Sequence, residues 1–180
     1  MRVHDFTSSM ALTERPDVKT GIEKALRAQL PGLLAIHQAA KANDMAGIDY
    51  WIEFAGGIMR SVDVKMRSRD YEAEGKPGLA LETWSNVDAE KIGWSRDPSK
   101  LCDYVLFYWH STGRSYLVDF RQLQPLFAKE WRNWRGKYGG VIQRNENDGC
   151  NPYRSECLFM PTRDLAAALY REYTNPAMAA

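Results

Sequence analysis

The chain has 180 residues, of which 44% are hydrophobic and 26% are charged, and its formal net charge is +1 at pH 7. This composition is that of an ordinary soluble globular protein, and no apolar run reaches the roughly 18 to 20 residues of a membrane-spanning helix. These values argue against a membrane protein and predict a single domain over residues 1–180, with a core from about 17 to 173 and loose ends.

The first predicted elements are two helices. A capping-box pair, Thr20 and Glu23, and an apolar stripe at helical spacing predict a helix that begins near residue 17. The Pro-Gly pair at 31–32 interrupts this pattern, so a second helix is expected over residues 33–42.

Segments rich in aromatic and β-branched residues then predict five strands, with Ala-Gly-Gly at 55–57 as the first turn. The order of elements differs from a regular βαβ alternation, and no glycine-rich phosphate loop is present. It predicts a mixed α/β (α+β) domain with a central mixed sheet flanked by helices. The strands are expected at 49–54, 58–66, 78–84, 102–109 and 114–120, a helix at 123–135, short strands near 139–144 and 156–160, and a last helix after Thr162.

Three cysteines, Cys102, Cys150 and Cys157, occur without CxxC spacing. Such an odd and sparse set argues against a disulfide framework and against a zinc knuckle, and it is typical of a reducing compartment. The amino-terminal segment also has no continuous apolar core of the signal-peptide type. We therefore expect a cytoplasmic protein.

Charged residues occupy the predicted hairpin over residues 49–66. Side chains alternate along a strand, so Asp63 and Lys65 share one face while the interleaved apolar residues face the core. Asp49 stands at the start of the neighbouring strand. If the two strands pair, the carboxylates of Asp49 and Asp63 approach to metal-bridging distance.

Two carboxylates at that distance repel each other and raise each other's pKa unless a cation neutralises them. Mg²⁺ or Mn²⁺ would do so, because hard cations bind carboxylate, water and phosphate oxygens. Lys65 would then orient the attacking water and offset the negative charge of the transition state. The pattern predicts a metal site at Asp49 and Asp63, with Lys65 as a catalytic residue. The alternative is an ion pair of Asp63 and Lys65 on an exposed strand face, of little energetic weight.

Asp49, a spacer of 13 residues and then Asp63-Val64-Lys65 resembles the core motif of the PD-(D/E)XK nuclease superfamily, which includes restriction endonucleases, Holliday-junction resolvases and phage exonucleases. Ile48 stands where the proline of the motif would be. A glutamate on the first helix is common in resolvase-like members, and Glu23 matches it, although helix capping explains Glu23 equally well. The block from Leu81 to Trp109 also resembles small phage and prokaryotic members.

The resemblance implies a restriction-endonuclease-like core, in which a helix is followed by a strand meander, a helix and another strand. It implies a Mg²⁺-dependent nuclease that hydrolyses DNA, with branched, phage or mobile-element DNA as substrate. The backbone carbonyl of Val64 and the side chain of Glu23 are further implied metal ligands. A homodimer is also implied, since resolvases of this type cut two strands symmetrically.

Basic and aromatic residues are interleaved over residues 129–144, and such a segment can follow a phosphate backbone and stack on bases. A helix with a solvated basic side, and with Trp131 and Trp134 in the core, is an equal alternative. The candidate nucleic-acid-binding residues are Lys129, Arg132, Arg135 and Lys137.

Glu82 either adds a metal ligand from an adjacent strand or is solvated, and residues 91–100 form either a DNA-contacting loop or an ordinary surface loop. The three histidines have no metal-ligand spacing. We therefore expect a metal-dependent DNA nuclease; the alternative is a catalytically inactive module of the same fold that binds nucleic acid or a protein partner.

Overall fold

The computed structural model describes residues 2–5, 11–40, 43, 46–146 and 152–174, and Cys150 and the predicted loose end after Thr174 lie outside them. The chain divides into two compact units. Unit 1 comprises Met1–Thr7, Tyr71–Asp97 and Gln122–Ala180, and unit 2 comprises Ser8–Asp70 and Pro98–Arg121. Each unit is built on its own five-stranded sheet with parallel and antiparallel neighbours. The predicted mixed α/β class is confirmed, with two mixed sheets in place of the single one expected.

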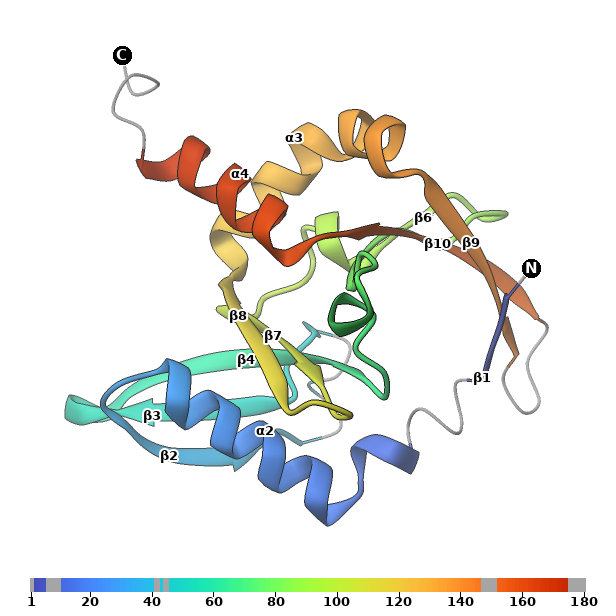
Figure 1. Ribbon diagram of the computed structural model, residues 1–180. Helices are drawn as coiled ribbons and strands as arrows, with labels where there is room; N and C mark the ends of the chain where they lie inside the picture. Colours follow the sequence, from blue (N-terminus) through green and yellow to red (C-terminus); the bar gives the residue numbers. More distant parts are fainter. Residues whose placement is uncertain (1, 6–10, 41–42, 44–45, 147–151, 175–180) are drawn as a thin grey trace. The chain divides into compact units, whose positions relative to one another are not determined.

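The sheet of unit 2 has the order β2-β3-β4-β7-β8 (Figure 1). The first three strands form an antiparallel meander, β7 runs parallel to β4, and β8 returns antiparallel to β7. As a result, β4 lies at the centre of the sheet with a partner on each side. The strands are β2 (Leu33–Gln38), β3 (Tyr50–Phe54), β4 (Ile58–Arg67), β7 (Tyr104–Trp109) and β8 (Arg114–Asp119).

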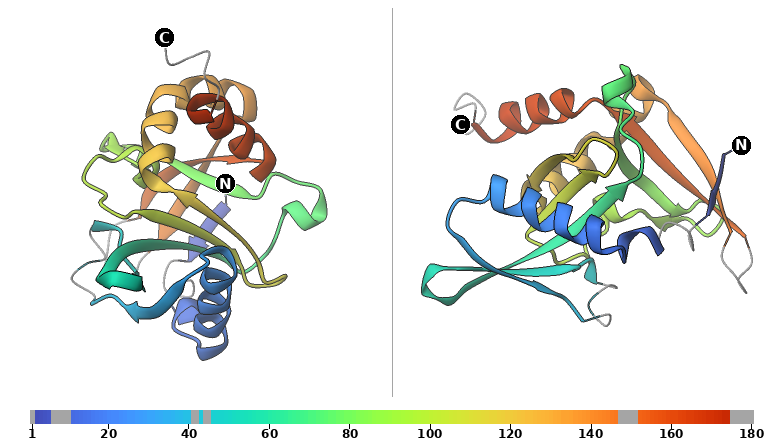
Figure 2. Two further views of the ribbon diagram at one scale, coloured as in Figure 1. Left: turned by 90° about the vertical axis from the view of Figure 1, so that its left-hand side faces the viewer. Right: turned by 60° about the horizontal axis from the view of Figure 1, so that its bottom comes forward.

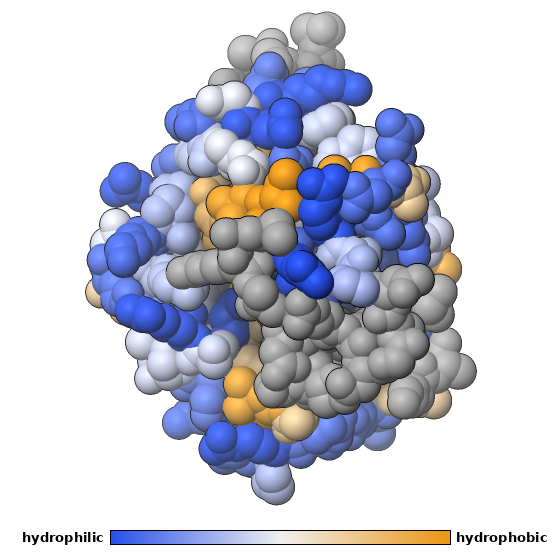
Figure 3. All heavy atoms as spheres, turned by 90° about the vertical axis from the view of Figure 1, so that its right-hand side faces the viewer, coloured by the Kyte–Doolittle hydropathy of each residue, from blue (hydrophilic) through white to orange (hydrophobic). Residues whose placement is uncertain are grey.

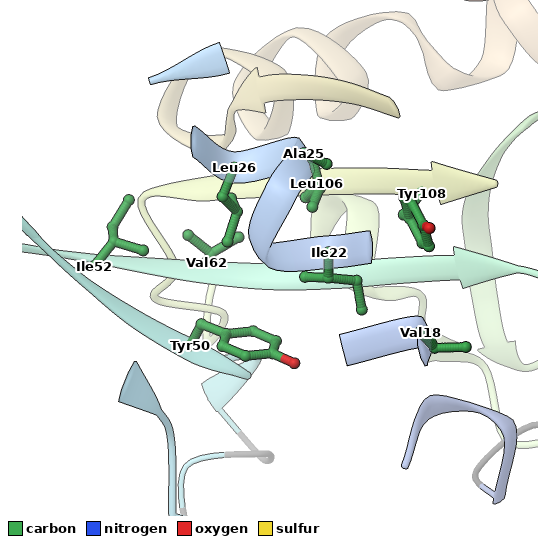
Figure 4. Packing of buried hydrophobic residues seen from close by; sticks show 9 residues of the cluster. All are labelled: Val18, Ile22, Ala25, Leu26, Tyr50, Ile52, Val62, Leu106 and Tyr108. Carbon is green, nitrogen blue, oxygen red and sulfur yellow. The ribbon is translucent and has the colours of Figure 1, made fainter. Parts of the chain in front are cut away.

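Helix α2 (Pro16–Gln29) packs on one face of this sheet (Figure 4). Pro16 is compatible with the first helical turn, where a backbone N–H has no intrahelical partner. The buried stripe of the helix, Val18, Ile22, Ala25 and Leu26, follows the spacing of one helical face. It contacts the buried sheet residues Tyr50, Ile52, Val62, Leu106 and Tyr108, and the partly buried Val64 and Met66 pack against the same cluster. Val62, Val64 and Met66 of β4 therefore face the core, as predicted.

The predicted helix over residues 33–42 is wrong, because Leu33–Gln38 form strand β2. Its apolar run is too short for periodicity to separate a helix from a strand, and pairing with β3, with Ile36 opposite Ile52, decides in favour of the strand. The predicted capping box is also wrong. The helix begins at Pro16, so Thr20 lies inside it, and its hydroxyl donates a hydrogen bond of 2.9 Å to the carbonyl of Pro16.

The sheet of unit 1 has the order β1-β9-β10-β5-β6, in which β1 is parallel to β9 and the other neighbours are antiparallel (Figure 2). Leu81, Leu158 and Leu165 are fully buried in this unit. The predicted strands at 78–84, 139–144 and 156–160 and the last two helices are confirmed, whereas β1 and β6 were not predicted. The elements are β1 (Arg2–Asp5), β5 (Leu79–Asn86), β6 (Lys91–Ile92), β9 (Gly140–Glu146), β10 (Tyr153–Met160), α3 (Phe120–Tyr138, which begins in unit 2) and α4 (Thr162–Thr174).

None of the helices in the described ranges has the length and apolar character that crossing a membrane requires. On the face drawn in Figure 3, hydrophilic residues predominate among the coloured atoms, and hydrophobic residues form only small patches.

Candidate active site

The pairing of β3 with β4 brings the two predicted metal ligands together. Tyr50 lies opposite Val62, so continuing the antiparallel ladder by one residue places Asp49 opposite Asp63. The backbone holds Asp49 there, because its N–H donates a 2.9 Å hydrogen bond to the carbonyl of Val62. Its carboxylate Oδ2 in turn accepts a 2.7 Å hydrogen bond from the N–H of Val64.

Asp63 and Lys65 extend from the same face of β4, opposite to the face that packs on α2. The ammonium Nζ of Lys65 lies 2.8 Å from Oδ2 of Asp63. Asp63 is only 4% exposed, whereas the side chain of Lys65 is 29% exposed. This is not the exposed strand-face pair of the alternative interpretation, because the acid is buried and the amine can reach solvent.

The electrostatics of Asp49 reflect the closeness of the two acids. Burial, and next the negative charge of Asp63, raise the pKa of Asp49 from 3.8 to about 6. The hydrogen bond from Val64 and the charge of Lys65 oppose this rise but do not cancel it. At Asp49 the positive charge of Lys65 therefore offsets only part of the effect of burial and of the charge of Asp63. A divalent cation with oxygen ligands would fit this donor set, since it would neutralise both acids at once.

Two described segments, one before β3 and one before β7, meet beside Asp63. Gly47 has a positive φ of 73°, and a Cβ added to it would lie 3.4 Å from Oδ2 of Asp63 and 3.2 Å from Cδ of Lys100. The segment that carries Lys100 is attached to the same loop, because the N–H of Leu101 donates a 3.0 Å hydrogen bond to the carbonyl of Ala46. The structure thus places a second lysine stem beside Gly47 and Asp63.

Asp103 anchors the chain that enters β7 to the centre of β4. Its Oδ2 accepts hydrogen bonds from the backbone N–H and the hydroxyl of Ser61, at 2.8 and 3.0 Å, and Arg121 forms an ion pair with its other oxygen. The hydrogen bonds fix β4 at Ser61, two residues before Asp63. Sequence reasoning missed Asp103, and its only signal was an acid directly before an apolar strand.

Cys102 is buried and lies close enough to Asp63 for the charge of that acid to act on its thiol. Burial, and next the negative charge of Asp63, raise the pKa of its thiol to about 12. The thiol therefore stays protonated at neutral pH, and a thiolate nucleophile is not part of the chemistry here.

Glu23 does not join the two aspartates. It is exposed on α2, and that helix packs on the face of the sheet opposite to Asp63 and Lys65. Among the residues that the structure describes, no group of three His, Cys, Asp or Glu side chains is arranged to hold a metal ion. The described side chains that could bind a cation at this site are therefore the carboxylates of Asp49 and Asp63. Water and substrate oxygens would complete the coordination of the cation.

Of the two interpretations of Glu82, the one that makes it a metal ligand from a strand adjacent to β4 is wrong. Glu82 lies on β5, whose neighbours are β10 and β6, and its Oε2 accepts a 3.1 Å hydrogen bond from the N–H of Trp94. The loop over residues 91–100 is also divided, because Lys91, Trp94 and Arg96 belong to unit 1 and Lys100 to unit 2.

The basic residues of α3 are mostly paired with acids. Lys129 lies 2.9 Å from Glu172, and Lys137 lies 3.6 Å from Asp164, both on α4. Arg135 forms a 2.8 Å ion pair with the buried Glu156, and Arg132 instead lies over the ring of Trp131, 4.6 Å from its centroid. Trp131 and Trp134 are 9% and 8% exposed, which matches the interpretation of α3 as a helix with core tryptophans.

The two described histidine side chains contact acids other than Asp49 and Asp63. His37 is on β2 rather than on a helix, and its Nε2 is 3.6 Å from the carboxylate of Glu53. His110 has its Nε2 3.5 Å from Asp17.

Comparisons of the chain with protein-family models, with curated proteins and with solved structures gave no match.

Proposed function

We propose that this chain is a metal-dependent nuclease that hydrolyses phosphodiester bonds in DNA. The observation that carries the proposal is the placement of Asp49, directly before β3 and hydrogen-bonded to β4, beside Asp63 on β4, with the ammonium of Lys65 at 2.8 Å from Asp63. Burial beside a like charge raises the pKa of Asp49 to about 6, and such perturbed acids are typical of functional sites.

The arrangement of unit 2 supports a restriction-endonuclease-like core. A helix, α2, is followed by the meander β2-β3-β4, with Asp49 just before β3 and Asp63-Val64-Lys65 on β4. A later strand, β7, then pairs parallel to β4. The departure is the connection from β4 to β7, which contains β5 and β6 where the resemblance implies a helix.

Asp49 and Asp63 would hold Mg²⁺ or Mn²⁺, which would supply Lewis-acid activation of a water molecule and of a phosphoryl oxygen. The carboxylate of Asp49 is held by the N–H of Val64, so its orientation is set before any ligand binds. Lys65, partly open to solvent, would orient the attacking water and offset the charge that develops on the phosphate oxygens.

The proposal is tested by cleavage of supercoiled and branched DNA with Mg²⁺ or Mn²⁺. Asp63→Asn and Lys65→Ala are each expected to lower the cleavage rate by about 100-fold or more, because the first removes a carboxylate that would hold the cation and the second removes positive charge that would face the transition state. Glu53→Gln is the matched control, since Glu53 is a partly exposed acid on the same hairpin, and it should cleave at the wild-type rate. Metal-dependent cleavage that persists in both Asp63→Asn and Lys65→Ala would exclude this site.

A second function, nucleic-acid binding without hydrolysis, is favoured by one observation. The ion pair of Asp63 and Lys65 partly neutralises the site without any metal. Calorimetric titration with Mn²⁺ separates the two functions. Heat of binding that disappears in Asp63→Asn supports the nuclease, and DNA binding without a Mn²⁺ site supports the binding module.

A further inference from the structure

Three arginines gather around Trp131 in unit 1. The guanidinium carbon of Arg96 lies 4.3 Å from the ring centroid of Trp84 and 4.5 Å from that of Trp131. Arg132 approaches the ring of Trp131 at 4.6 Å. Arg135 follows one helical turn after Trp131 on α3. Cation–π contacts of this kind hold guanidinium groups in place beside aromatic rings.

Glu156, the acid at this cluster, is already paired with Arg135. Glu156 is 2% exposed, and Arg135 binds both of its carboxylate oxygens, with the closest contact at 2.8 Å. The hydroxyl of Thr83 donates a further 2.7 Å hydrogen bond to Glu156. Within the described part of the chain, neither Arg96 nor Arg132 has a carboxylate partner at ion-pair distance. The cluster therefore carries an excess of positive charge.

Arg96 is the least exposed member of the cluster. Its Nε donates a 3.0 Å hydrogen bond to the carbonyl of Thr83, whereas its buried Nη2 has no hydrogen-bond partner in the described structure. Burial, and then the positive charge of Arg132, lower the pKa of Arg96. An anion close to both guanidinium groups would relieve this repulsion.

A hollow of about 360 Å³ opens beside these residues, lined by Trp131, Arg132, Arg135 and Gly136. Gly136 leaves space there, because a Cβ added to it would meet no atom within 4 Å. Arg132 is exposed, and the side chain of Arg135 is 54% exposed, so both guanidinium groups can be reached from solvent.

We propose that this hollow binds a phosphate group through Arg132 and Arg135, with Arg96, whose guanidinium carbon lies 4.5 Å from the ring centroid of Trp131, adding positive charge. Guanidinium N–H groups match the oxygens of phosphate in geometry and charge, and Trp131 limits the freedom of Arg132 before binding. The phosphate comes either from a nucleic-acid backbone or from a free phosphate ion, and both present the same oxygens. This site lies in unit 1 and requires no hydrolysis at Asp49 and Asp63 in unit 2.

The test is calorimetric titration of the full chain with EDTA present, so that no metal-dependent cleavage occurs. One arm uses inorganic phosphate, and the other uses single-stranded oligothymidine of about ten nucleotides, a length that one binding domain can cover. Arg132→Ala is expected to weaken binding about tenfold or more, because it removes charge-assisted hydrogen bonds. Arg163→Ala, which removes the same charge from an exposed position on α4, should change binding less than twofold.

The two arms together identify which ligand the hollow binds. Competition between phosphate and the oligonucleotide, with both weakened by Arg132→Ala, assigns the site to a nucleic-acid backbone; binding of phosphate alone assigns it to the free ion. The salt dependence of oligonucleotide binding should also become less steep by about one phosphate contact in Arg132→Ala. The proposal is overturned if neither ligand binds the wild type, or if Arg132→Ala and Arg163→Ala weaken binding equally.

Discussion

Ionisation of the Asp49 carboxyl destabilises the folded chain at neutral pH. Its pKa in the folded chain is about 6, above the ordinary value of 3.8, because burial and the neighbouring Asp63 disfavour its charged form. The contribution of this carboxyl to the stability of the folded chain is therefore fully present below about pH 4, the ordinary pKa of an aspartate, where it is protonated in both the folded and the unfolded chain. This stabilisation is lost as the pH rises through about 6, since deprotonation is then harder in the folded than in the unfolded chain.

Asp49→Asn should remove this pH dependence. Relative to the variant, the wild type is expected to lose about 1–2 kcal/mol of unfolding free energy between pH 4 and pH 8, after allowance for the partial exposure of Asp49. Urea unfolding of both proteins without divalent metal, across that pH range, measures the difference. Glu90→Gln, at an exposed acid, is the control and should follow the wild-type curve. Parallel curves for the wild type and Asp49→Asn would contradict the assigned environment of Asp49.

At the scale of elements, the contact of α2 with the sheet depends on a glycine in the helix. A Cβ added to Gly21 would lie 2.0 Å from Oη and 2.8 Å from Cζ of Tyr108. Tyr108 is 5% exposed and belongs to the core under α2, so its ring has little room to move. The absence of a side chain at this position lets the helix approach β7 closely.

Gly21→Ala is therefore expected to destabilise unit 2, although alanine favours helix formation more than glycine does. The clash with Tyr108 should outweigh the propensity gain and lower the unfolding free energy by about 1–3 kcal/mol. Lys24→Ala, at an exposed position of the same helix, should change the unfolding free energy by less than about 0.5 kcal/mol. Chemical denaturation followed by circular dichroism compares the two, and a Gly21→Ala variant as stable as the wild type would argue against this packing.

At the scale of the whole molecule, the chain passes between the two units at four places, after Thr7, Asp70, Asp97 and Arg121. Helix α3 begins with Phe120 in unit 2 and continues through unit 1. Because the segments of each unit are joined through the other, we expect the units to unfold together, as a single domain would.

Two buried cysteines can test this expectation, since Cys102 lies in unit 2 and Cys157 in unit 1. In a Cys150→Ser background, both thiols should become reactive at the same urea concentration, measured by labelling and peptide mass spectrometry. Leu158→Ala, in the core of unit 1, should lower the unfolding free energy by about 2–5 kcal/mol and shift both labelling midpoints together. A shift confined to Cys157 would instead assign two separately folding domains.

Much of the candidate site was predictable because its signal is local. The alternation of charged and apolar residues along β4 depends only on the period of a strand, so the shared face of Asp63 and Lys65 followed directly from the sequence. The short turn between the strands likewise placed Asp49 near Asp63, since a hairpin pairs segments that are close in the chain.

The amino-acid sequence by itself thus determined the mixed α/β class, the core hairpin and the two facing acids, because these depend on local periodicity and turns. Only the tertiary structure decided that residues 33–38 are a strand, that Asp103 anchors β4, and that Glu82 belongs to another sheet. It also decided that Lys129, Arg135 and Lys137 pair with acids while Arg132 lies over Trp131. Each of these outcomes depends on which distant segments come into contact, and local patterns carry no information about such contacts.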